Sequence, residues 1–328
     1  MIDRKLFRDI LAFDSTTGSE GPLADFLEKT LQAPSVQGWD VPEGGRNLLF
    51  SWGVPRVVFC THMDTVPPYI PPKAEGDVVY GRGACDAKGQ IAAMYAACKA
   101  METEGLDGFG LLLLSGEETG SWGAKAFAKT AFRAPYLIVG EPTDGKMVSA
   151  CKGTKAFELH FLGEPFHSGY PQFGSSAVDA FVDFVNELRE VDFDTDPVLG
   201  ATTWNIGRLV SDNPQNVLSP SLRCRLYFRT TFVSDAMVTE EVRRIISGYH
   251  AEIAEIGGDA PSRWFTVPGF ECAPASFGSD APHLSNFEHR AICGSGSIRF
   301  AHRDDEHITL AELDEAAERY VAMFKALR

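Results

Sequence analysis

Histidine and acidic residues stand in five short segments of this chain, and both residue types bind divalent metal ions. Imidazole nitrogens and carboxylate oxygens are common ligands of zinc. Two neighbouring cations need a carboxylate between them, and together they lower the pKa of a water that bridges them. A separate carboxylate must then accept the proton of that water. The residues available for these roles are His62 and Asp64, Asp86, Glu117 and Glu118, Glu141, and His302.

Three of these segments lie at the ends of apolar runs that indicate buried strands. The runs span 56–64, 109–118 and 134–142, and residues 89–105 and 122–132 between them are typical of helices. Continuous apolar strands separated by helices predict an α/β fold, with a mostly parallel sheet that has helices on both faces. In such sheets, ligands bind beyond the carboxyl ends of the strands. We therefore expect the metal-binding side chains to converge on one crevice.

Each segment also has a simpler explanation when it is taken alone. A histidine such as His62 at a strand end is usually a solvated loop residue, and a Glu-Glu pair is usually surface charge. Asp86 could cap the helix that follows it. Glu141 could be a turn residue, and His302 could be a surface residue in a charged loop. Five such segments at the expected places of one α/β scaffold favour a shared site over coincidence.

The sequence pattern changes after about residue 152. Alternating apolar and polar residues predict strands with one solvated face, and amphipathic stretches predict helices between them. The order β-α-β-β-α-β favours a small antiparallel sheet with two helices, the ferredoxin-like arrangement. The predicted elements are strands 154–163, 201–211, 221–230 and 263–269, and helices 175–191 and 235–257.

Features of the first unit return near the end of the chain, at 291–298 and in a predicted helix at 309–327. The second unit is therefore expected to be inserted into the first. We predict one domain made of 1–152 and 268–328, and an inserted domain made of 153–267.

Charge and cysteine content bear on partners and location. The chain has 328 residues and a net charge of −15, without a basic block, so we expect no nucleic-acid partner. No apolar run reaches the ~20 residues that cross a bilayer, and no signal peptide is apparent, so we expect no membrane partner. Seven scattered cysteines without a CxxC pair indicate reduced thiols. These features predict a cytoplasmic protein.

Eight segments, in the same order along the chain, resemble the co-catalytic zinc amidohydrolases. That family includes acetylornithine deacetylase, succinyl-diaminopimelate desuccinylase, carboxypeptidase G and aminoacylase. The motifs together are specific for the family and much less specific for a substrate. The matching segments are THMDTVP (61–67), GRGACDAKGQIAA (81–93), SGEETGSWGA (115–124), VGEPTD (139–144), FHSGYP (166–171), NVLSP (216–220), FGSDAP (277–282) and GSGSIRFAHRDDEHI (294–308).

The resemblance implies two zinc ions per chain, held in a zinc-peptidase-like catalytic domain. His62 and Glu141 would bind one ion, Glu118 and His302 would bind the other, and Asp86 would bridge both. Cobalt or manganese can substitute at sites of this kind.

The resemblance also implies roles beyond the metal ligands. Asp64 would orient His62, a common arrangement of carboxylate, histidine and metal. Glu117 would be the general base and the later proton donor to the leaving amine. The peptide bond between Asp86 and Ala87 is a candidate for a cis bond, because the family often has one after its bridging aspartate.

Three residues of the inserted domain match family positions near the substrate. His167 would stabilise the oxyanion, in dimers often across the subunit interface. Asn216 would lie near the substrate, and Arg229 would receive the substrate carboxylate, to which a guanidinium is well suited. His167 could instead be an ordinary loop residue, and Arg229 an ordinary surface residue. The resemblance further implies that the inserted domain is a lid and the contact surface of a homodimer.

The reaction implied is hydrolysis of the amide bond of an N-acyl amino acid, as in acetylornithine deacetylase. A succinyl-diaminopimelate desuccinylase-like substrate, a dipeptide or a carboxypeptidase substrate is the alternative, so the partner is an N-acyl amino acid or short peptide. The segment 68–79 is shorter than usual, which weakens any transfer of substrate. Cys85 is interpreted as a packing residue.

Two readings from other classes are less favoured. A catalytically inactive binding module would normally lack a ligand or the base, and here all are present. A serine hydrolase needs a G-x-S-x-G elbow after a buried strand, which neither 120–123 nor 294–297 provides.

Overall fold

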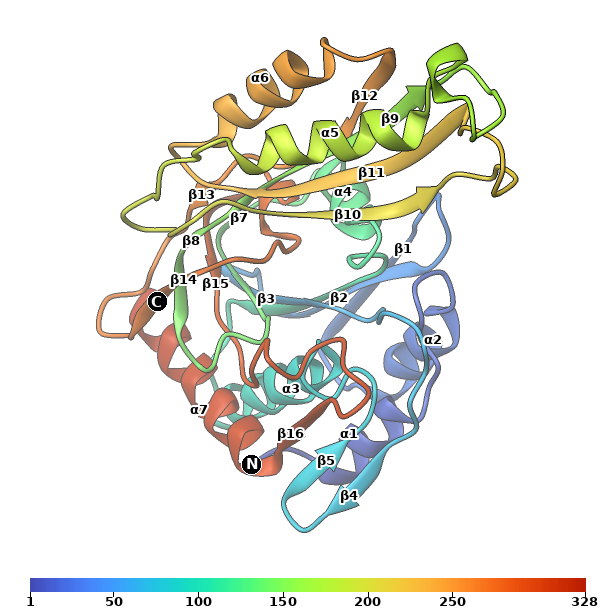
Figure 1. Cartoon of the computed structure of the whole chain (residues 1–328). Coiled ribbons are helices and arrows are strands. Elements are labelled where there is room, and N and C mark those ends of the chain that lie inside the picture. Colours follow the sequence, from blue (N-terminus) through green and yellow to red (C-terminus); the bar gives the residue numbers. More distant parts are fainter. The chain divides into compact units, whose positions relative to one another are not determined.

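The apolar strands of the first third of the chain lie side by side in one six-stranded sheet (Figure 1). The computed structural model describes residues 1–328. The sheet order is β1-β2-β6-β3-β7-β15. These strands are β1 (Ser35–Asp40), β2 (Arg46–Trp52), β3 (Val57–His62), β6 (Phe109–Leu114), β7 (Ala134–Val139) and β15 (Phe287–Ile292).

The sheet is mixed, so the prediction of a mostly parallel sheet is only partly correct. Strands β6, β3, β7 and β15 are parallel, whereas β1 and β2 pair antiparallel at one edge. Residues of β1 are almost all exposed, so this edge strand carries no apolar run that would reveal it. The central parallel strands, which determine where a site can form, agree with the prediction.

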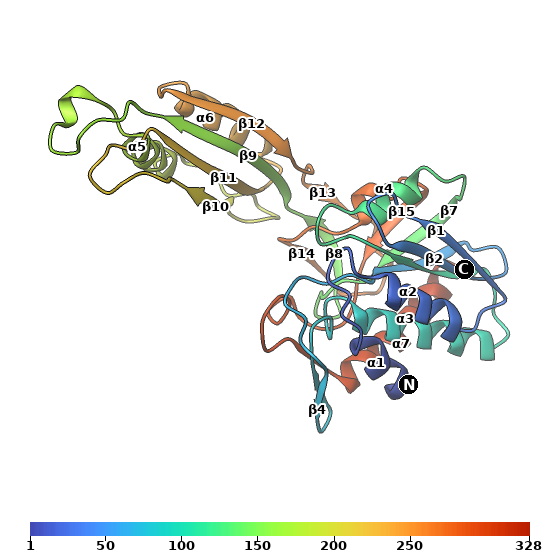
Figure 2. The ribbon, with the colours of Figure 1, turned by 90° about the vertical axis from the view of Figure 1, so that its right-hand side faces the viewer.

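Helices cover the sheet on both faces, but unequally. Val57 and Phe59 of β3 belong to a core shared with four helices, whereas the alternate residues Val58 and Cys60 point to the opposite face. Figure 2 shows the four helices on one side and α4 (Trp122–Ala128) on the other. The four helices are α1 (Arg4–Leu11), α2 (Gly21–Thr30), α3 (Lys88–Thr103) and α7 (Leu310–Leu327).

Local capping fixes where several helices begin. The Asp3 side chain accepts the backbone N–H groups of Lys5 and Leu6 at the start of α1. Thr309 and Glu312 form a capping box at the start of α7, and each satisfies a backbone N–H of the other. Such caps supply partners to N–H groups that the first turn of a helix leaves unpaired.

The second unit is a four-stranded antiparallel sheet with two helices. Its elements follow the order β9 (Gly153–Leu162), α5 (Ala177–Arg189), β10 (Thr203–Val210), β11 (Ser221–Thr230), α6 (Asp235–Ile246) and β12 (Ala251–Gly257). The strand order is β10-β11-β9-β12, the ferredoxin-like order predicted from the sequence. Inward-facing residues of β9 and β11, such as Phe161 and Phe228, form a separate core with both helices.

Two predicted elements of this unit are wrong. The helix predicted over 235–257 ends at Ile246, and the chain turns back at residues 247–250 into β12. The stretch 263–269 was predicted to close the sheet, but β12 fills that position. The apolar residues of AEIAEI (251–256) fit both the helical and the strand period, so the sequence pattern continues the helix past Gly248. Pairing with β9 makes the segment a strand instead.

The chain divides into two compact units. The first comprises Met1–Ser149, Trp264–Ala273 and Ser279–Arg328, and the second comprises Ala150–Arg263 and Pro274–Gly278. A three-stranded sheet, β13 (Ser262–Arg263), β8 (Met147–Cys151) and β14 (Cys272–Ala275), lies where the chain passes from one unit to the other. The first unit also contains a small sheet of β16 (His307–Thr309), β5 (Val78–Tyr80) and β4 (Lys73–Glu75), and the short helix η2 (Ala281–His283).

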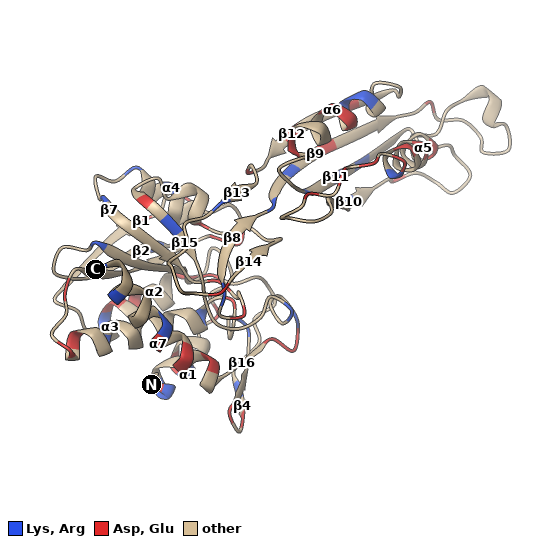
Figure 3. Cartoon of the chain, turned by 90° about the vertical axis from the view of Figure 1, so that its left-hand side faces the viewer, with Lys and Arg blue, Asp and Glu red and all other residues tan.

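Charged side chains of both signs are interspersed along the helices. Figure 3 shows basic and acidic positions on the same helices, for example on α6, which carries Glu240 and Glu241 beside Arg243 and Arg244. No helix has the length and apolar character needed to cross a membrane.

The packing of the parallel strands predicts a large effect from a cavity at their centre. Leu113 of β6 is fully buried, and Leu113→Ala should lower the free energy of unfolding by about 2–5 kcal/mol. Val54→Ala, at a side chain that is 86% exposed, is the control and should change it by less than about 0.5 kcal/mol. Denaturant unfolding at fixed metal concentration measures both. Equal effects of the two substitutions would contradict this packing.

Candidate metal centre

The parallel strands bring three of the predicted segments to one edge of the sheet. His62 is the last residue of β3 and pairs with Leu114, the last residue of β6. Glu117 and Glu118 follow β6, and Glu141 follows β7, whose Val139 pairs with Cys60. Because parallel strands end at the same edge, residues that are up to 79 positions apart become neighbours.

Two glycines allow the close approach of these segments. Gly116 has φ +72, a conformation that turns the chain just before Glu117, and a Cβ there would lie 2.7 Å from the Trp122 ring. A Cβ at Gly294 would lie 2.3 Å from the carbonyl oxygen of Glu141. A side chain at Gly294 would push apart the segments that carry Glu141 and His302, and one at Gly116 would displace Trp122 just after the two glutamates.

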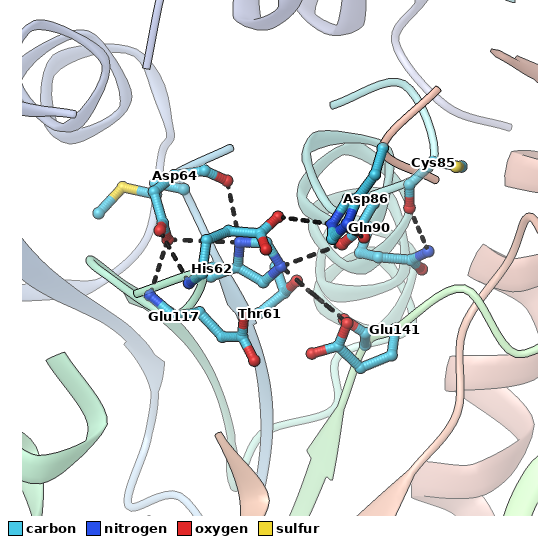
Figure 4. A network of polar contacts seen from close by, with 12 residues as sticks. Thr61, His62, Asp64, Cys85, Asp86, Gln90, Glu117 and Glu141 are labelled. Carbon is cyan, nitrogen blue, oxygen red and sulfur yellow. Dashed lines mark hydrogen bonds and ion pairs between the residues drawn. The ribbon is translucent and has the colours of Figure 1, made fainter. Parts of the chain in front are cut away.

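Asp86 lies between the two histidines and contacts each with a different oxygen. Its Oδ1 is 3.2 Å from His62 Nε2, and its Oδ2 is 3.2 Å from His302 Nε2. The same His302 nitrogen is 3.2 Å from Glu118 Oε1, and His62 Nε2 is 4.0 Å from Glu141 Oε2. Figure 4 shows His62 between Asp64, Asp86 and Glu141. The structure thus brings together all five residues that the sequence suggested as ligands.

These residues form groups with the composition of metal sites. In each of three sets, the candidate ligand atoms lie within 4.8 Å of one another: His62, Asp86 and Glu141; Asp86, Glu118 and His302; and His62, Glu117 and Glu118. Asp86 is common to the first two sets. The buried Glu141 Oε1 has no hydrogen-bond partner in the protein. A buried carboxylate oxygen without a donor is suited to a cation, so the donor set fits a pair of metal ions.

The electrostatic field of the carboxylates acts strongly on both imidazoles. Burial acts to lower the pKa of His62, but its contacts with Asp64 and Asp86 raise this pKa well above the usual value. Hydrogen bonds to Asp86 and Glu118 raise the pKa of His302 to about 10. Protons therefore compete with a metal ion for these nitrogens, so metal affinity should rise with pH.

The carboxyl groups respond in opposite directions. Burial acts to raise the pKa of Asp86, but hydrogen bonds from His302 and His62 outweigh it and hold this pKa well below its usual range. Burial raises the pKa values of Glu117 and Glu141 well above the usual value, and nearby carboxylates add to the effect. Carboxylates this close to one another need positive charge between them.

Residues 58–326 match the model of peptidase family M20/M25/M40. The chain belongs to this family. It is therefore a metallopeptidase or amidohydrolase, an enzyme that hydrolyses peptide or other amide bonds.

Relatives and solved structures agree with this membership. A probable carboxypeptidase of Aspergillus terreus is 33% identical over 97% of this chain and 85% of that protein. A peptidase M20 domain-containing protein of Schizosaccharomyces pombe is 30% identical over 97% of this chain and 83% of its own length. The fold is also shared with a Staphylococcus aureus tripeptidase (TM-score 0.83, 18% identity, 100% and 99% covered). It is shared as well with a dinuclear metal-binding M20 peptidase of Bacillus subtilis (TM-score 0.70, 14% identity, 98% and 96% covered).

Asp64 connects the M20 metal site to the loop that carries the two glutamates. This fully buried carboxylate accepts the backbone N–H of Glu117 at 3.0 Å and that of Glu118 at 3.1 Å. The Thr17 hydroxyl donates to it at 2.8 Å, and its Oδ1 lies 3.4 Å from His62 Nδ1. The Asp64 side chain thereby holds both glutamate backbones, and the backbone carbonyl of Asp64, 2.9 Å from His62 Nδ1, is the nearer contact of the imidazole.

Several residues of this M20 site had no predicted role. Glu20 is buried and accepts the N–H of Gly116 at 3.0 Å, and the buried Gln90 donates to the carbonyls of Cys85 and Ser295. Asp280 is buried with an unpartnered Oδ1, and burial raises its pKa to about 6. Gly116 and Ser295 are distant in sequence from Glu20 and Gln90, so only the presence of Gln90 and Asp280 in the quoted motifs pointed to these residues.

Arg82 and Glu306 are two further residues without a predicted role, and they form a fully buried ion pair at 2.7 Å. Cys85 is buried, and its sulfur lies 3.7 Å from Glu306 Oε1 and outside all three metal-type groups. The Asp86–Ala87 peptide bond is cis, as expected.

The three residues that are expected to lie near the substrate, His167, Asn216 and Arg229, all belong to the second unit. His167 and Asn216 are exposed and adjacent: the N–H of Ser168 donates to the Asn216 carbonyl at 2.9 Å, and His167 bridges to Val217. Arg229 pairs with Thr154 near the start of β9, whereas His167 follows the end of that strand. Within this unit, the structure brings His167 and Asn216 together but not Arg229.

The contacts of Asp64 predict that its charge supports metal binding. Asp64→Asn replaces an acceptor oxygen with an NH2 group facing backbone N–H donors, and should weaken metal affinity about 10–100-fold. Thr17→Val removes a single donor to the same carboxylate and should have a clearly smaller effect. Titration of the metal-free protein, followed by mass spectrometry of bound metal, tests this. Unchanged affinity in Asp64→Asn would contradict the positioning role.

Proposed function

We propose that this M20 enzyme binds two metal ions and hydrolyses the amide bond of an N-acyl amino acid or a short peptide. The placement of Asp86 between His62 and His302 carries the proposal, because one carboxylate faces two separate sets of ligands. His62 and Glu141 would hold one ion, and Glu118 and His302 the other. Zinc suits the nitrogen and oxygen donors, and cobalt or manganese are possible substitutes.

Glu117 is the proposed general base. Bound metal ions would supply Lewis-acid activation of the carbonyl group and of water. Glu117 takes the proton of the attacking water and later gives it to the leaving amine. Its half-buried carboxylate belongs to a metal-type group with His62 and Glu118, and burial raises its pKa, which makes it a stronger base than an exposed glutamate. Its backbone is held by Asp64.

The second unit would supply recognition of the substrate. We propose that Arg229 binds the substrate carboxylate, that His167 stabilises the oxyanion and that Asn216 lies near the substrate. Arg229 is half-buried and stacks on Tyr227 at 5.1 Å, which orients the guanidinium. Residues His167 and Asn216 sit on adjoining exposed segments. A homodimer through this unit is part of the proposal, supported by the exposed Leu209 and Val210 on edge strand β10.

Two substrate forms follow from this proposal. An acetylornithine-like N-acyl amino acid fits the motif resemblance, and a peptide cleaved at its carboxyl-terminal residue fits the relatives named as probable carboxypeptidases. Both forms present the same chemistry, an amide bond next to a free carboxylate. The names of relatives that cover 97% of this chain favour the peptide form.

Metal content measured with a substrate panel tests the proposal. We expect about two metal ions per chain after zinc reconstitution, and ninhydrin-detected release of amino acids from the panel. The panel contains N-acetylornithine, other N-acetyl amino acids, N-succinyl-diaminopimelate, dipeptides and N-blocked dipeptides. Methyl esters of the active substrates are the matched control and should react poorly, because they lack the carboxylate. A reconstituted chain that binds no metal would refute the site.

Changing each of the adjacent glutamates to glutamine should impair a different property of the enzyme, turnover for Glu117 and metal binding for Glu118. Glu117→Gln should keep both metal ions and lose about 10²–10⁴-fold in kcat, because the proton acceptor is gone. Glu118→Gln should instead lose metal, because it removes a charged ligand beside His302. Metal analysis and kcat are measured on the same samples. Near-normal turnover of fully loaded Glu117→Gln would contradict its role.

A further inference from the structure

A buried carboxylate outside the ligand set connects the two loops that carry Asp86 and His302. Glu306 Oε1 accepts the backbone N–H groups of Cys85 and Asp86, each at 3.2 Å. Its other oxygen receives Arg82 Nη1 at 2.7 Å. Glu306 and Arg82 are each 1% exposed. The carboxylate therefore has three charge-assisted or backbone contacts and almost no access to solvent.

Arg82 ties the same two loops a second time. Its Nη1 also donates to the Arg303 carbonyl at 3.1 Å, and its Nε donates to the Pro68 carbonyl at 3.2 Å. The N–H of Gly81 donates to the carbonyl of Glu306 at 3.0 Å. One loop thus holds Arg82 four residues before Asp86, and the other holds Glu306 four residues after His302.

Asp86 and His302, the two candidate metal ligands in these loops, lie outside regular secondary structure. Asp86 precedes α3 in an irregular loop, and His302 has φ +65, a left-handed conformation that is uncommon for a residue other than glycine. The relative position of the Asp86 carboxylate and the His302 imidazole therefore depends on contacts between the loops. The Glu306–Arg82 pair supplies most of the polar contacts described there.

We infer that Glu306, oriented by Arg82, is a positioning residue that sets the separation of Asp86 and His302 and thereby the affinity of the metal ion they share with Glu118. Glu306 contacts neither of these side chains; it acts through the backbone of Asp86 and through its own loop. The inference rests on the proposed two-metal function. A buried ion pair is a weak source of net stability, so geometry is the better explanation of its presence.

Glu306→Gln tests the inference. Every neighbour of the Glu306 carboxylate is a hydrogen-bond donor. A glutamine has one acceptor oxygen and one NH2 group, so its NH2 group must face a donor with which it cannot bond. We expect the metal ion at Asp86, Glu118 and His302 to bind about 10–100-fold more weakly, and the ion at His62 and Glu141, whose only ligand in these two loops is Asp86, to be weakened clearly less. The kcat should fall at limiting metal while KM changes little. The visible spectrum of the cobalt-loaded protein should lose the contribution of the weakened site.

Two further variants separate positioning from folding. Glu28→Gln is the control, because it breaks the partly buried Arg46–Glu28 pair, whose side chains bond each other and neither the loop of Asp86 nor that of His302, and both metal affinities should stay at the wild-type value. Arg82→Lys keeps a cation opposite Glu306 but loses the fork that reaches two carbonyls. It should weaken the same metal ion by a smaller factor than Glu306→Gln does, and it serves as the test if Glu306→Gln does not fold.

The outcomes distinguish this inference from the proposed function. Wild-type protein with two metal ions and turnover, together with a folded Glu306→Gln of unchanged affinities, would overturn the inference alone. An equal loss of both metal ions with a lower melting temperature would also overturn it, because that is the behaviour of a purely structural ion pair. Unchanged affinities in Arg82→Lys would count against it in the same way. A wild-type chain that binds no metal would overturn the proposed function and this inference with it.

Discussion

Mutual repulsion among buried acidic groups is the constraint on which this site depends. Asp64, Asp86 and Glu141 are nearly inaccessible to solvent, and Glu117 and Glu118 lie beside them. Several negative charges in a medium of low dielectric constant separate, take up protons or bind cations unless the surrounding structure holds them. The pKa values of both histidines and of Glu117 and Glu141 are all raised: contacts with carboxylates raise those of the histidines, and burial, with nearby carboxylates, raises those of the two glutamates. The backbone N–H groups on Asp64 and Glu306 are the means by which the fold resists this repulsion.

The sequence predicts the parts of the site that depend on local pattern. Strands β3, β6 and β7 are mostly apolar runs, so their ends, and with them His62, the pair Glu117–Glu118 and Glu141, follow from hydrophobicity and from the rule for parallel sheets. Strands β9, β10 and β11 of the second unit follow from the alternation of their residues. The remaining candidate ligands, Asp86 and His302, lie in loops, and the motif resemblance placed them.

What the sequence does not predict depends on contacts between distant residues. Strand β1 is exposed and is recognisable only as the partner of β2, and β12 was absorbed into a predicted helix because pairing with β9 is not visible in the local pattern. Arg82 and Glu306 are 224 residues apart, and although both lie in the quoted motifs, nothing in the local pattern predicts that they pair. Substrate choice also depends on contacts between distant residues. The motifs identify the family, but the residues proposed to contact the substrate, His167, Asn216 and Arg229, lie in the second unit.

Because a chain is synthesised from its amino terminus, Asp86 is made long before His302, with which it shares a candidate metal position. The metal-type group of Asp86, Glu118 and His302 needs a residue that is made 161 positions after Glu141, whereas His62, Asp86 and Glu141 are all made before residue 150. A growing chain can assemble the first group, and can fold the continuous segment 150–263, while the second group is still incomplete. The residues of two metal positions that are neighbours in space thus become available at different times during synthesis, because His302 follows the whole of the second unit in the chain.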